Sequence, residues 1–191
     1  MFDLEGKRVL VRPAETKDLR LLYTWRNQAD FIELCSARRR IVGYEEFVEE
    51  FHRDLDGDRH IQCVIERLKD QTTIGTVFSY NLNLVDGFVF VTIFVDEHYR
   101  RLGYSVEAMA LFLDYLFTTL PLHKIYMEVY GYNDASLSVV RRAGFAQEAC
   151  FKEHRYLDGK RHDLFRFALF RDKSQVVKDF LARLRLRKEG G

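Results

Sequence analysis

The segment from Phe88 to Val95, with the sequence FVFVTIFV, constrains the fold more than any other part of this 191-residue chain. It consists almost entirely of β-branched and aromatic residues, which favour strands. It also lacks the alternation of apolar and polar side chains that marks a strand with one solvated face, so we predict a central strand buried on both faces. The segment from Val106 to Leu120 carries apolar residues at three- and four-residue spacing and predicts a helix. A buried strand that leads into a helix is typical of a mixed α/β domain.

The other predicted elements continue this mixture of strands and helices. Apolar and β-branched runs predict strands at residues 7–12, 60–66, 73–80, 124–130, 151–157 and 164–170. Helical spacing predicts helices at residues 18–25, 44–51 and 133–143. We expect one domain over residues 1–172, followed by a basic helix or tail over residues 173–191.

Composition and charge exclude several classes of protein. The chain has 30 basic and 29 acidic residues and a net charge of +1, so nucleic acid is not an expected partner. No apolar run reaches the length of a membrane span, and the first residues are acidic and lack the apolar core of a secretory signal. Cys35, Cys63 and Cys150 are far apart and show no metal-ligand spacing. We therefore expect a cytoplasmic protein with reduced cysteines, no metal and no membrane partner.

The stretch that carries chemistry runs from Val95 to Ala108, with the sequence VDEHYRRLGYSVEA. The start of the predicted helix presents unpaired N–H groups and a partial positive charge, which together can bind a phosphate or pyrophosphate. Gly103 would let the main chain approach an anion closely, and Arg100 and Arg101 add formal positive charge. The alternative is an ordinary strand-to-helix turn with a solvated pair of arginines.

This stretch resembles a known motif. Arg100-x-x-Gly103-x-Ser105 is similar to the R/Q-x-x-G-x-G/A motif of GNAT acetyltransferases, although Ser105 stands where that family usually has glycine or alanine. Asn133-Asp134-Ala135-Ser136, with Ala143-Gly144-Phe145 after it, resembles the N-x-x-S…G-F signature of the ribosomal-protein N-terminal acetyltransferase branch (RimJ/RimL-like). Trp25-Arg26-Asn27, followed by Ile41-x-x-Tyr44-Glu45-Glu46-Phe47, is similar to amino-sugar acetyltransferases of the pseudaminic-acid pathway. The resemblance covers about residues 7–172.

The resemblance implies a fold and an activity. The fold would be a single α/β (α+β) GNAT-like domain, with helices flanking a mixed central sheet that is splayed between the parallel strands 88–95 and 124–130. The pantetheine arm of acetyl-coenzyme A would lie in the gap, and a primary amine would attack the thioester directly. Such an enzyme needs no nucleophile of its own, in agreement with the lack of a convincing Cys/His pair.

The resemblance also assigns residues. The cofactor-binding residues would be Phe94, Val95, Arg100, Arg101, Leu102, Gly103, Tyr104, Ser105 and Asn133. A main-chain N–H near Phe94 and Val95 would polarise the thioester carbonyl. Ser136 would be the catalytic residue that donates a proton to the leaving thiolate. Asn133 and Ser136 could equally serve as helix-capping residues, and both roles can hold together.

The usual acid and base residues of the family are missing. Phe90, Val140 and Arg155 occupy the three positions at which family members carry a glutamate, a tyrosine and a glutamate. Glu128, His154 or a water chain could take over the role of the base. The missing bases leave open a second interpretation, in which the chain is a non-catalytic module that binds coenzyme A.

The acceptor is open at this point. A protein N-terminus, an amino sugar or another small amine would fit, and the chain would act as a monomer or homodimer. Without a strong base, an enzyme must use the neutral fraction of its acceptor. An α-amino group has a pKa of about 7.7–8.0 and a lysine-like amine about 10.4. The missing bases therefore favour a peptide N-terminus or a low-pKa amino sugar over a polyamine.

Overall fold

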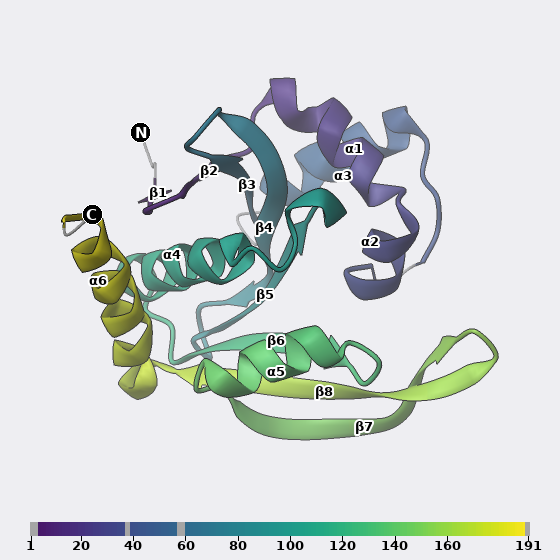
Figure 1. The fold of residues 1–191 in the computed structure, drawn as a ribbon. Helices are drawn as coiled ribbons and strands as arrows, with labels where there is room; N and C mark the ends of the chain where they lie inside the picture. The colour runs from purple at the N-terminus through teal and green to yellow at the C-terminus, as the bar shows by residue number, and fades with distance from the viewer. Residues whose placement is uncertain (1–3, 37–38, 57–59, 190–191) are drawn as a thin grey trace.

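The computed structural model describes residues 4–36, 39–56 and 60–189 (Figure 1). Within these residues eight strands form one sheet in the order β1-β2-β3-β4-β5-β6-β8-β7. The strands are β1 (Leu4–Glu5), β2 (Val9–Pro13), β3 (Ile61–Arg67), β4 (Thr72–Asn83), β5 (Phe88–Val95), β6 (Lys124–Tyr130), β7 (Ala146–Leu157) and β8 (Lys160–Phe170). Among these strands, β5 and β6 are the parallel neighbours, and the other pairs are antiparallel.

The parallel pairing of β5 and β6 is short. The ladder joins Phe88 to Lys124, Val89 to Ile125 and Phe90 to Tyr126, and it ends there. Beyond this point β5 remains paired with β4, and β6 remains paired with β8, while the two ribbons diverge (Figure 1). The predicted fold class, a mixed sheet splayed between two parallel strands, is confirmed.

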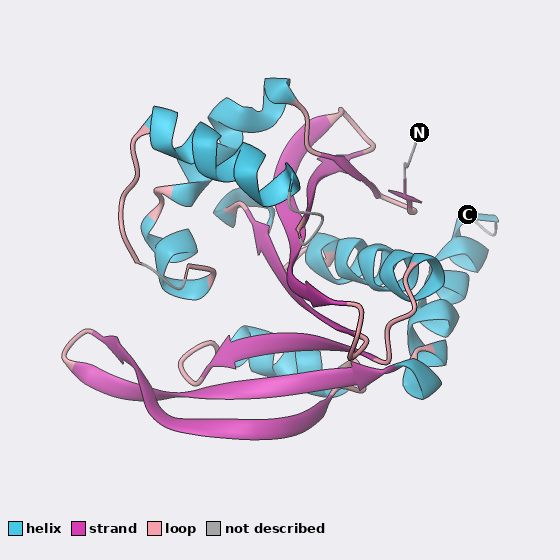
Figure 2. Ribbon diagram, turned by 180° about the vertical axis from the view of Figure 1, so that it is seen from behind, coloured by secondary structure: helices cyan, strands magenta, loops and turns pink. Residues whose placement is uncertain are grey.

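Helices cover both faces of the sheet (Figures 1 and 2). They are α1 (Leu19–Arg26), α2 (Ala29–Leu34), α3 (Tyr44–Asp56), α4 (Tyr104–Thr119), α5 (Asp134–Arg142) and α6 (Gln175–Glu189). Val89 and Val91 of β5 pack in the cluster formed with α4 and α5, while Phe94 packs among residues of α1, α2 and α3. This arrangement explains the unbroken apolar sequence of β5, because both of its faces are buried.

Two differences from the sequence predictions stand out. Helix α2 was not predicted, because six residues with the sequence ADFIEL are too few to show a helical period. Strand β7 begins at Ala146 rather than at residue 151, and its first three residues, Ala146, Gln147 and Glu148, are exposed. Helix α6 lies within the segment expected as a helix or tail, and its Val177 and Leu181 are buried in the main core.

Candidate active site

The loop between β5 and α4 turns the chain at the open end of the gap. Gly103 is the N-cap of α4 and has a φ of +82°, a left-handed conformation that favours glycine. Arg101 also has a positive φ, of 60°, so it tightens the same turn. The first N–H groups of a helix have no acceptor within the helix, and α4 presents them just after Gly103. The main chain therefore turns sharply at Gly103, and a helix starts directly after it, as the sequence predicted.

A third arginine that the sequence analysis did not include reaches this loop. Arg8, in the turn before β2, donates from Nη1 to the carbonyl oxygen of Leu102 at 2.8 Å, and its guanidinium lies 5.1 Å from the centre of the Tyr104 ring. Its Nε donates to Glu107 Oε2 at 2.9 Å. Glu107 is fully buried and also accepts from the N–H groups of Lys7 and Arg8, at 2.6 and 2.8 Å. The buried carboxylate thus holds Arg8 beside the loop.

Arg100 and Arg101 have different surroundings. Arg100 donates from Nε to the carbonyl oxygen of Val95 at 2.7 Å, and it forms an ion pair with Asp30 of α2. Its guanidinium also lies 5.2 Å from the centre of the Phe94 ring. Arg101, by contrast, is exposed. Arg100 therefore links the loop to the end of β5 and to α2, while Arg101 is exposed to solvent.

The main chain of β5 offers groups to the gap beyond the end of the parallel ladder. The N–H of Asp96 donates to the carbonyl oxygen of Ile74 in β4 at 2.9 Å. Because main-chain groups of successive strand residues point to opposite edges, those of Phe94 face β4 and those of Ile93 and Val95 face β6. Within the described residues, the carbonyl oxygen of Ile93 is contacted by Cys35 Sγ at 3.8 Å. The main-chain groups of Ile93 and Val95 thus lie on the gap side. Those of Phe94, which the resemblance placed beside the cofactor, face β4 instead, and the Phe94 ring packs among residues of α1, α2 and α3.

Asn133 and Ser136 meet at the start of α5. Asn133 is the N-cap, and its Oδ1 accepts from the main-chain N–H of Ser136 at 3.1 Å. The capping role that the sequence allowed is therefore present. The Ser136 side chain is half-buried, and the cap uses its N–H rather than its hydroxyl. A second role for the hydroxyl remains compatible with the cap.

Replacing Asn133 with alanine should lower the free energy of unfolding by about 1 kcal/mol, because one N–H at the start of α5 loses its acceptor. Urea denaturation measures the change. Asn133→Asp keeps a capping oxygen and serves as the matched variant, with near wild-type stability. If Asn133 also contacts the cofactor, the added negative charge should weaken acetyl-coenzyme A binding in this variant. Equal stability of wild type and Asn133→Ala would contradict the capping role.

A cavity of about 400 Å³ opens on the face of the sheet covered by α1, α2 and α3. Aromatic side chains line it from α2, α3 and β4, namely Phe31, Phe47, Phe51, Phe78 and Tyr80. Charged side chains of both signs line it as well, namely Arg26, Arg53, Glu50 and Asp54. Cys35 also lines the cavity, and its Sγ contacts the carbonyl oxygen of Ile93 in β5.

Comparison with known proteins decides the family. Residues 8–146 match the family described as Acetyltransferase (GNAT) domain, which is most of the chain. The chain belongs to the GNAT acetyltransferase family. It is therefore an acyltransferase that transfers an acetyl group to an amine. Acetyl-coenzyme A is the acetyl donor, as the sequence predicted.

Individual relatives of this GNAT acetyltransferase act on different amines. This chain is 29% identical over 166 residues to the spermidine N(1)-acetyltransferase of Escherichia coli (strain K12). The match covers 85% of this chain and 86% of that protein. The spermidine N-acetyltransferase of Vibrio cholerae, solved with CoA and spermine, has a TM-score of 0.83 at 22% identity, covering 89% of this chain and 99% of that one. RimL, a ribosomal L7/L12 alpha-N-protein acetyltransferase solved with coenzyme A, has a TM-score of 0.79 at 16% identity. The match covers 90% of this chain and 99% of that one.

The three positions at which GNAT acetyltransferases usually carry an acid or a base hold other contacts here. Phe90 is buried and stacks on Tyr126 with 4.8 Å between ring centres. Val140 is buried in the main core. The guanidinium of Arg155 is buried and donates to main-chain carbonyl oxygens near the end of α2. These side chains shape and support the site, and none of them is a base.

The two candidate bases, Glu128 and His154, have different surroundings. Glu128 accepts from Arg166 at 2.7 and 3.0 Å, and its charge helps to keep the pKa of the cavity residue Tyr80 high, at about 12, where burial is the main cause. His154 is exposed on β7, with its ring 5.7 Å from that of Phe151. Glu128 is thus electrostatically coupled to the cavity wall through Tyr80, and His154 lies on the open surface.

The described residues contain no group of three or more His, Cys, Asp or Glu side chains placed to hold a metal ion. None of the described helices combines the length and the apolar character that crossing a membrane requires.

Proposed function

We propose that this enzyme binds acetyl-coenzyme A in the gap between β5 and β6, and acetylates an amine that enters from the face of the sheet covered by α1, α2 and α3. The early end of the parallel ladder at Phe90 and Tyr126 carries this proposal. Beyond Phe90 the gap-side main chain of β5 has no partner among the described strands, so its N–H groups could pair with the pantetheine arm. The pyrophosphate would lie at the start of α4, beside Arg8 and Arg101. The acceptor would approach through the cavity, whose wall residue Cys35 contacts the carbonyl oxygen of Ile93 in β5.

Different groups of the site would act on the thioester oxygen and on the leaving sulfur. A main-chain N–H on the gap side of β5 would donate to the thioester oxygen, where negative charge develops. The Ser136 hydroxyl would donate a proton to the departing sulfur. The amine carries out the attack itself, so no covalent enzyme intermediate forms. A module that binds coenzyme A without catalysis is the alternative.

A thermal-shift measurement with acetyl-coenzyme A, followed by a thiol-release assay over a panel of amines, separates the enzyme from the module. An enzyme is stabilised by acetyl-coenzyme A and also releases thiol with at least one amine. A binding module is stabilised but releases none. The panel should contain peptides with free N-termini, amino sugars and polyamines.

For the acceptor, we propose an amine of low pKa, such as a peptide N-terminus, as the RimJ/RimL-like resemblance suggests, or an amino sugar. The lack of a base at positions 90, 140 and 155 supports this choice, because such amines are already largely neutral near pH 8. A polyamine is the second candidate, and the spermidine acetyltransferases among the relatives support it. Arginines as well as acids line the cavity, and such a wall suits a polycation less well than an acidic wall would.

The dependence of rate on pH tests the absence of a dedicated base. We expect the rate to rise with pH and to level off near the pKa of the acceptor itself, because the enzyme uses the neutral fraction of the amine. Two acceptors of different pKa, an α-amino peptide and a lysine-like amine, should give profiles about two to three pH units apart. If both profiles break at one pH, and Glu128→Gln or His154→Ala removes that break, a dedicated base exists.

We further propose that the enzyme works in the cytoplasm as a monomer or homodimer. The odd number of well-separated cysteines supports a reducing compartment. Sedimentation of the purified chain, with and without acetyl-coenzyme A, measures its oligomeric state directly.

A further inference from the structure

The hairpin of β7 and β8 contains an irregularity that turns one side chain inward. Phe151 pairs with Leu164, and the next pair is Arg155 with His162, so β7 has two extra residues at this point. Glu153, in the middle of this bulge, has a φ of +51°. Asp163 holds the bulge, because its Oδ1 accepts from the N–H of Glu153 at 3.0 Å. Bulges of this kind redirect side chains and are frequent beside active sites.

Arg155 is the side chain that the bulge directs inward. It is 7% exposed, and its Nη2 donates to the carbonyl oxygens of Ile32, Glu33 and Ser36 at 3.1, 3.1 and 3.0 Å. These carbonyls lie at the end of α2, where a helix leaves acceptors unpaired and favours a cation. Its Nε is buried and has no hydrogen-bond partner among the described residues. Stability alone would not favour a buried cation with an unpaired donor.

Helix α2 is attached to the other side of the gap as well. Asp30 forms the ion pair with Arg100 of the β5–α4 loop, and the Phe31 ring lies 5.1 Å from that of Phe94 in β5. Cys35 just after the helix contacts the carbonyl oxygen of Ile93. The segment from Asp30 to Ser36 therefore spans from β5 to the β7–β8 hairpin. It also supplies Phe31, Cys35 and Ser36 to the wall of the cavity.

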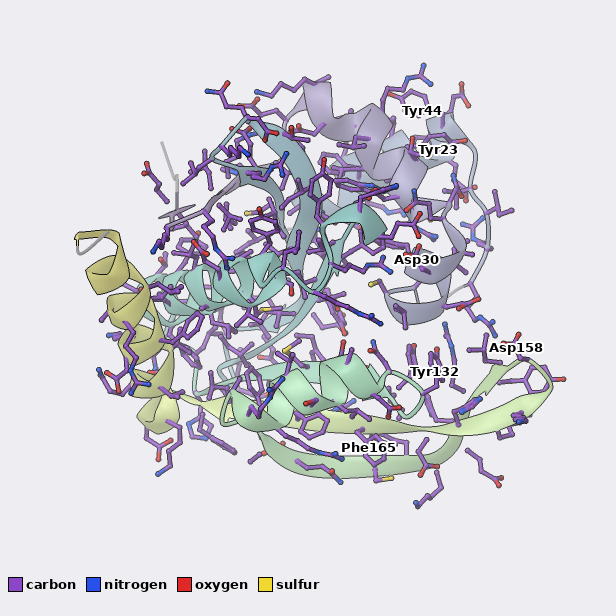
Figure 3. The ribbon with its side chains drawn as sticks, viewed as in Figure 1. Tyr23, Asp30, Tyr44, Tyr132, Asp158 and Phe165 are labelled. Carbon is purple, nitrogen blue, oxygen red and sulfur yellow. The ribbon has the colours of Figure 1, made fainter. Side chains whose placement is uncertain are left out.

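A second contact joins this segment to the start of α5. The Tyr132 hydroxyl donates to the carbonyl oxygen of Glu33 at 2.8 Å, and Figure 3 shows Tyr132 between α2 and the β7–β8 hairpin, whose tip carries Asp158. Tyr132 directly precedes Asn133, the cap of the helix that carries Ser136. Arg155 also lies over the Tyr130 ring, 4.4 Å from its centre. The cavity wall and the start of α5 are thus held by the same cluster.

We propose that Arg155 is a positioning residue for the acceptor amine: it fastens the segment from Asp30 to Ser36 across the gap and so sets the cavity wall relative to Ser136 and the thioester. Arg155 acts through main-chain carbonyls and does not contact the reacting atoms. The resemblance gave this position to a base, and here a structural cation has taken it. This inference rests on the proposed function, since it assumes that the acceptor enters through the cavity.

Steady-state kinetics test the proposal. Arg155→Met should lower kcat/KM for the acceptor by about tenfold or more, because displacements near 1 Å at a reacting centre can cost ~10²-fold. The dissociation constant of acetyl-coenzyme A should stay within about twofold of wild type, since the phosphate-binding loop is untouched. Arg155→Lys keeps the charge and should recover part of the loss. Arg161→Met removes an exposed arginine from the same hairpin and should behave as wild type. The proposal would be overturned if folded Arg155→Met lost affinity for acetyl-coenzyme A as much as it lost kcat/KM for the acceptor. It would also be overturned if kcat/KM for the acceptor did not change.

Labelling of Cys35 gives a readout that does not depend on activity. Burial raises the pKa of the Cys35 thiol to about 12, so it should react slowly while the segment is fastened. Arg155→Met, or Tyr132→Phe if the former does not fold, should speed its modification about tenfold through easier local opening. Cys63, buried in the main core, is the internal control and should not change. Unchanged Cys35 labelling in both variants would overturn the positioning role. A wild type that binds acetyl-coenzyme A but acetylates no amine would instead count against the proposed function.

Discussion

Replacing Ser136 with alanine is expected to lower the maximal rate of acetyl transfer ~10²–10⁴-fold, the range typical of a positioned proton donor. The apparent affinity for acetyl-coenzyme A should hardly change, because protonation of the leaving sulfur belongs to the transition state and not to binding. The geometry at the start of α5 supports an effect on the rate without an effect on the fold. The cap to Asn133 uses the Ser136 N–H, which alanine retains, so the helix start should survive the substitution.

A matched variant on the same helix makes the measurement specific. Ser138 is exposed and lies two residues further along α5, so Ser138→Ala changes the same atoms without reaching the gap. We expect wild-type kinetics from it. Single-turnover measurements should establish that chemistry limits the rate before the two variants are compared. An unchanged chemical step in Ser136→Ala would leave Ser136 with the capping role alone.

The parts of the site that the sequence predicted are those whose signals are local. A buried strand, a glycine and a helix follow one another within Val95 to Ala108, so the main-chain turn at Gly103 could be inferred from adjacent residues. Asn133 as the cap of α5 is local in the same way, since its acceptor and the N–H of Ser136 are three residues apart. In both cases the residues that interact are also close together in the sequence.

The parts that the sequence did not predict depend on contacts between distant residues. Arg8 lies 94 positions from Leu102, to which it donates, and nothing in its sequence neighbours indicates a place beside the β5–α4 loop. Arg155 lies 119 positions from Ser36, and its direction depends on a bulge that strand patterning does not reveal. Helix α2, which receives Arg155, is itself too short to be recognised. The part of the cavity wall that α2 and the residues after it supply therefore became visible only in the folded structure.

The substitution Gly103→Val should weaken acetyl-coenzyme A binding about 100-fold while leaving most of the fold in place. The loss corresponds to about 3 kcal/mol, or roughly two hydrogen bonds to a charged phosphate. The φ of +82° at Gly103 is unsuited to a β-branched residue, so the start of α4 must either strain or turn its N–H groups away. A Cβ at this position would also stand 3.1 Å from Nη2 of Arg8 and would push that guanidinium away from the loop.

Calorimetric titration with acetyl-coenzyme A measures the affinity, and circular dichroism with urea unfolding shows whether the variant is folded. We expect a stability loss of about 1–3 kcal/mol from backbone strain. Gly43→Val is the matched control, because a Cβ at Gly43 meets no atom within 4 Å and its φ lies outside the left-handed region. Gly103→Ala carries the same backbone strain without the branched side chain, so its affinity should fall between those of wild type and Gly103→Val. Unchanged affinity in a folded Gly103→Val would remove the β5–α4 loop from the cofactor site, and with it the arrangement in which Arg8 and Arg101 face the pyrophosphate.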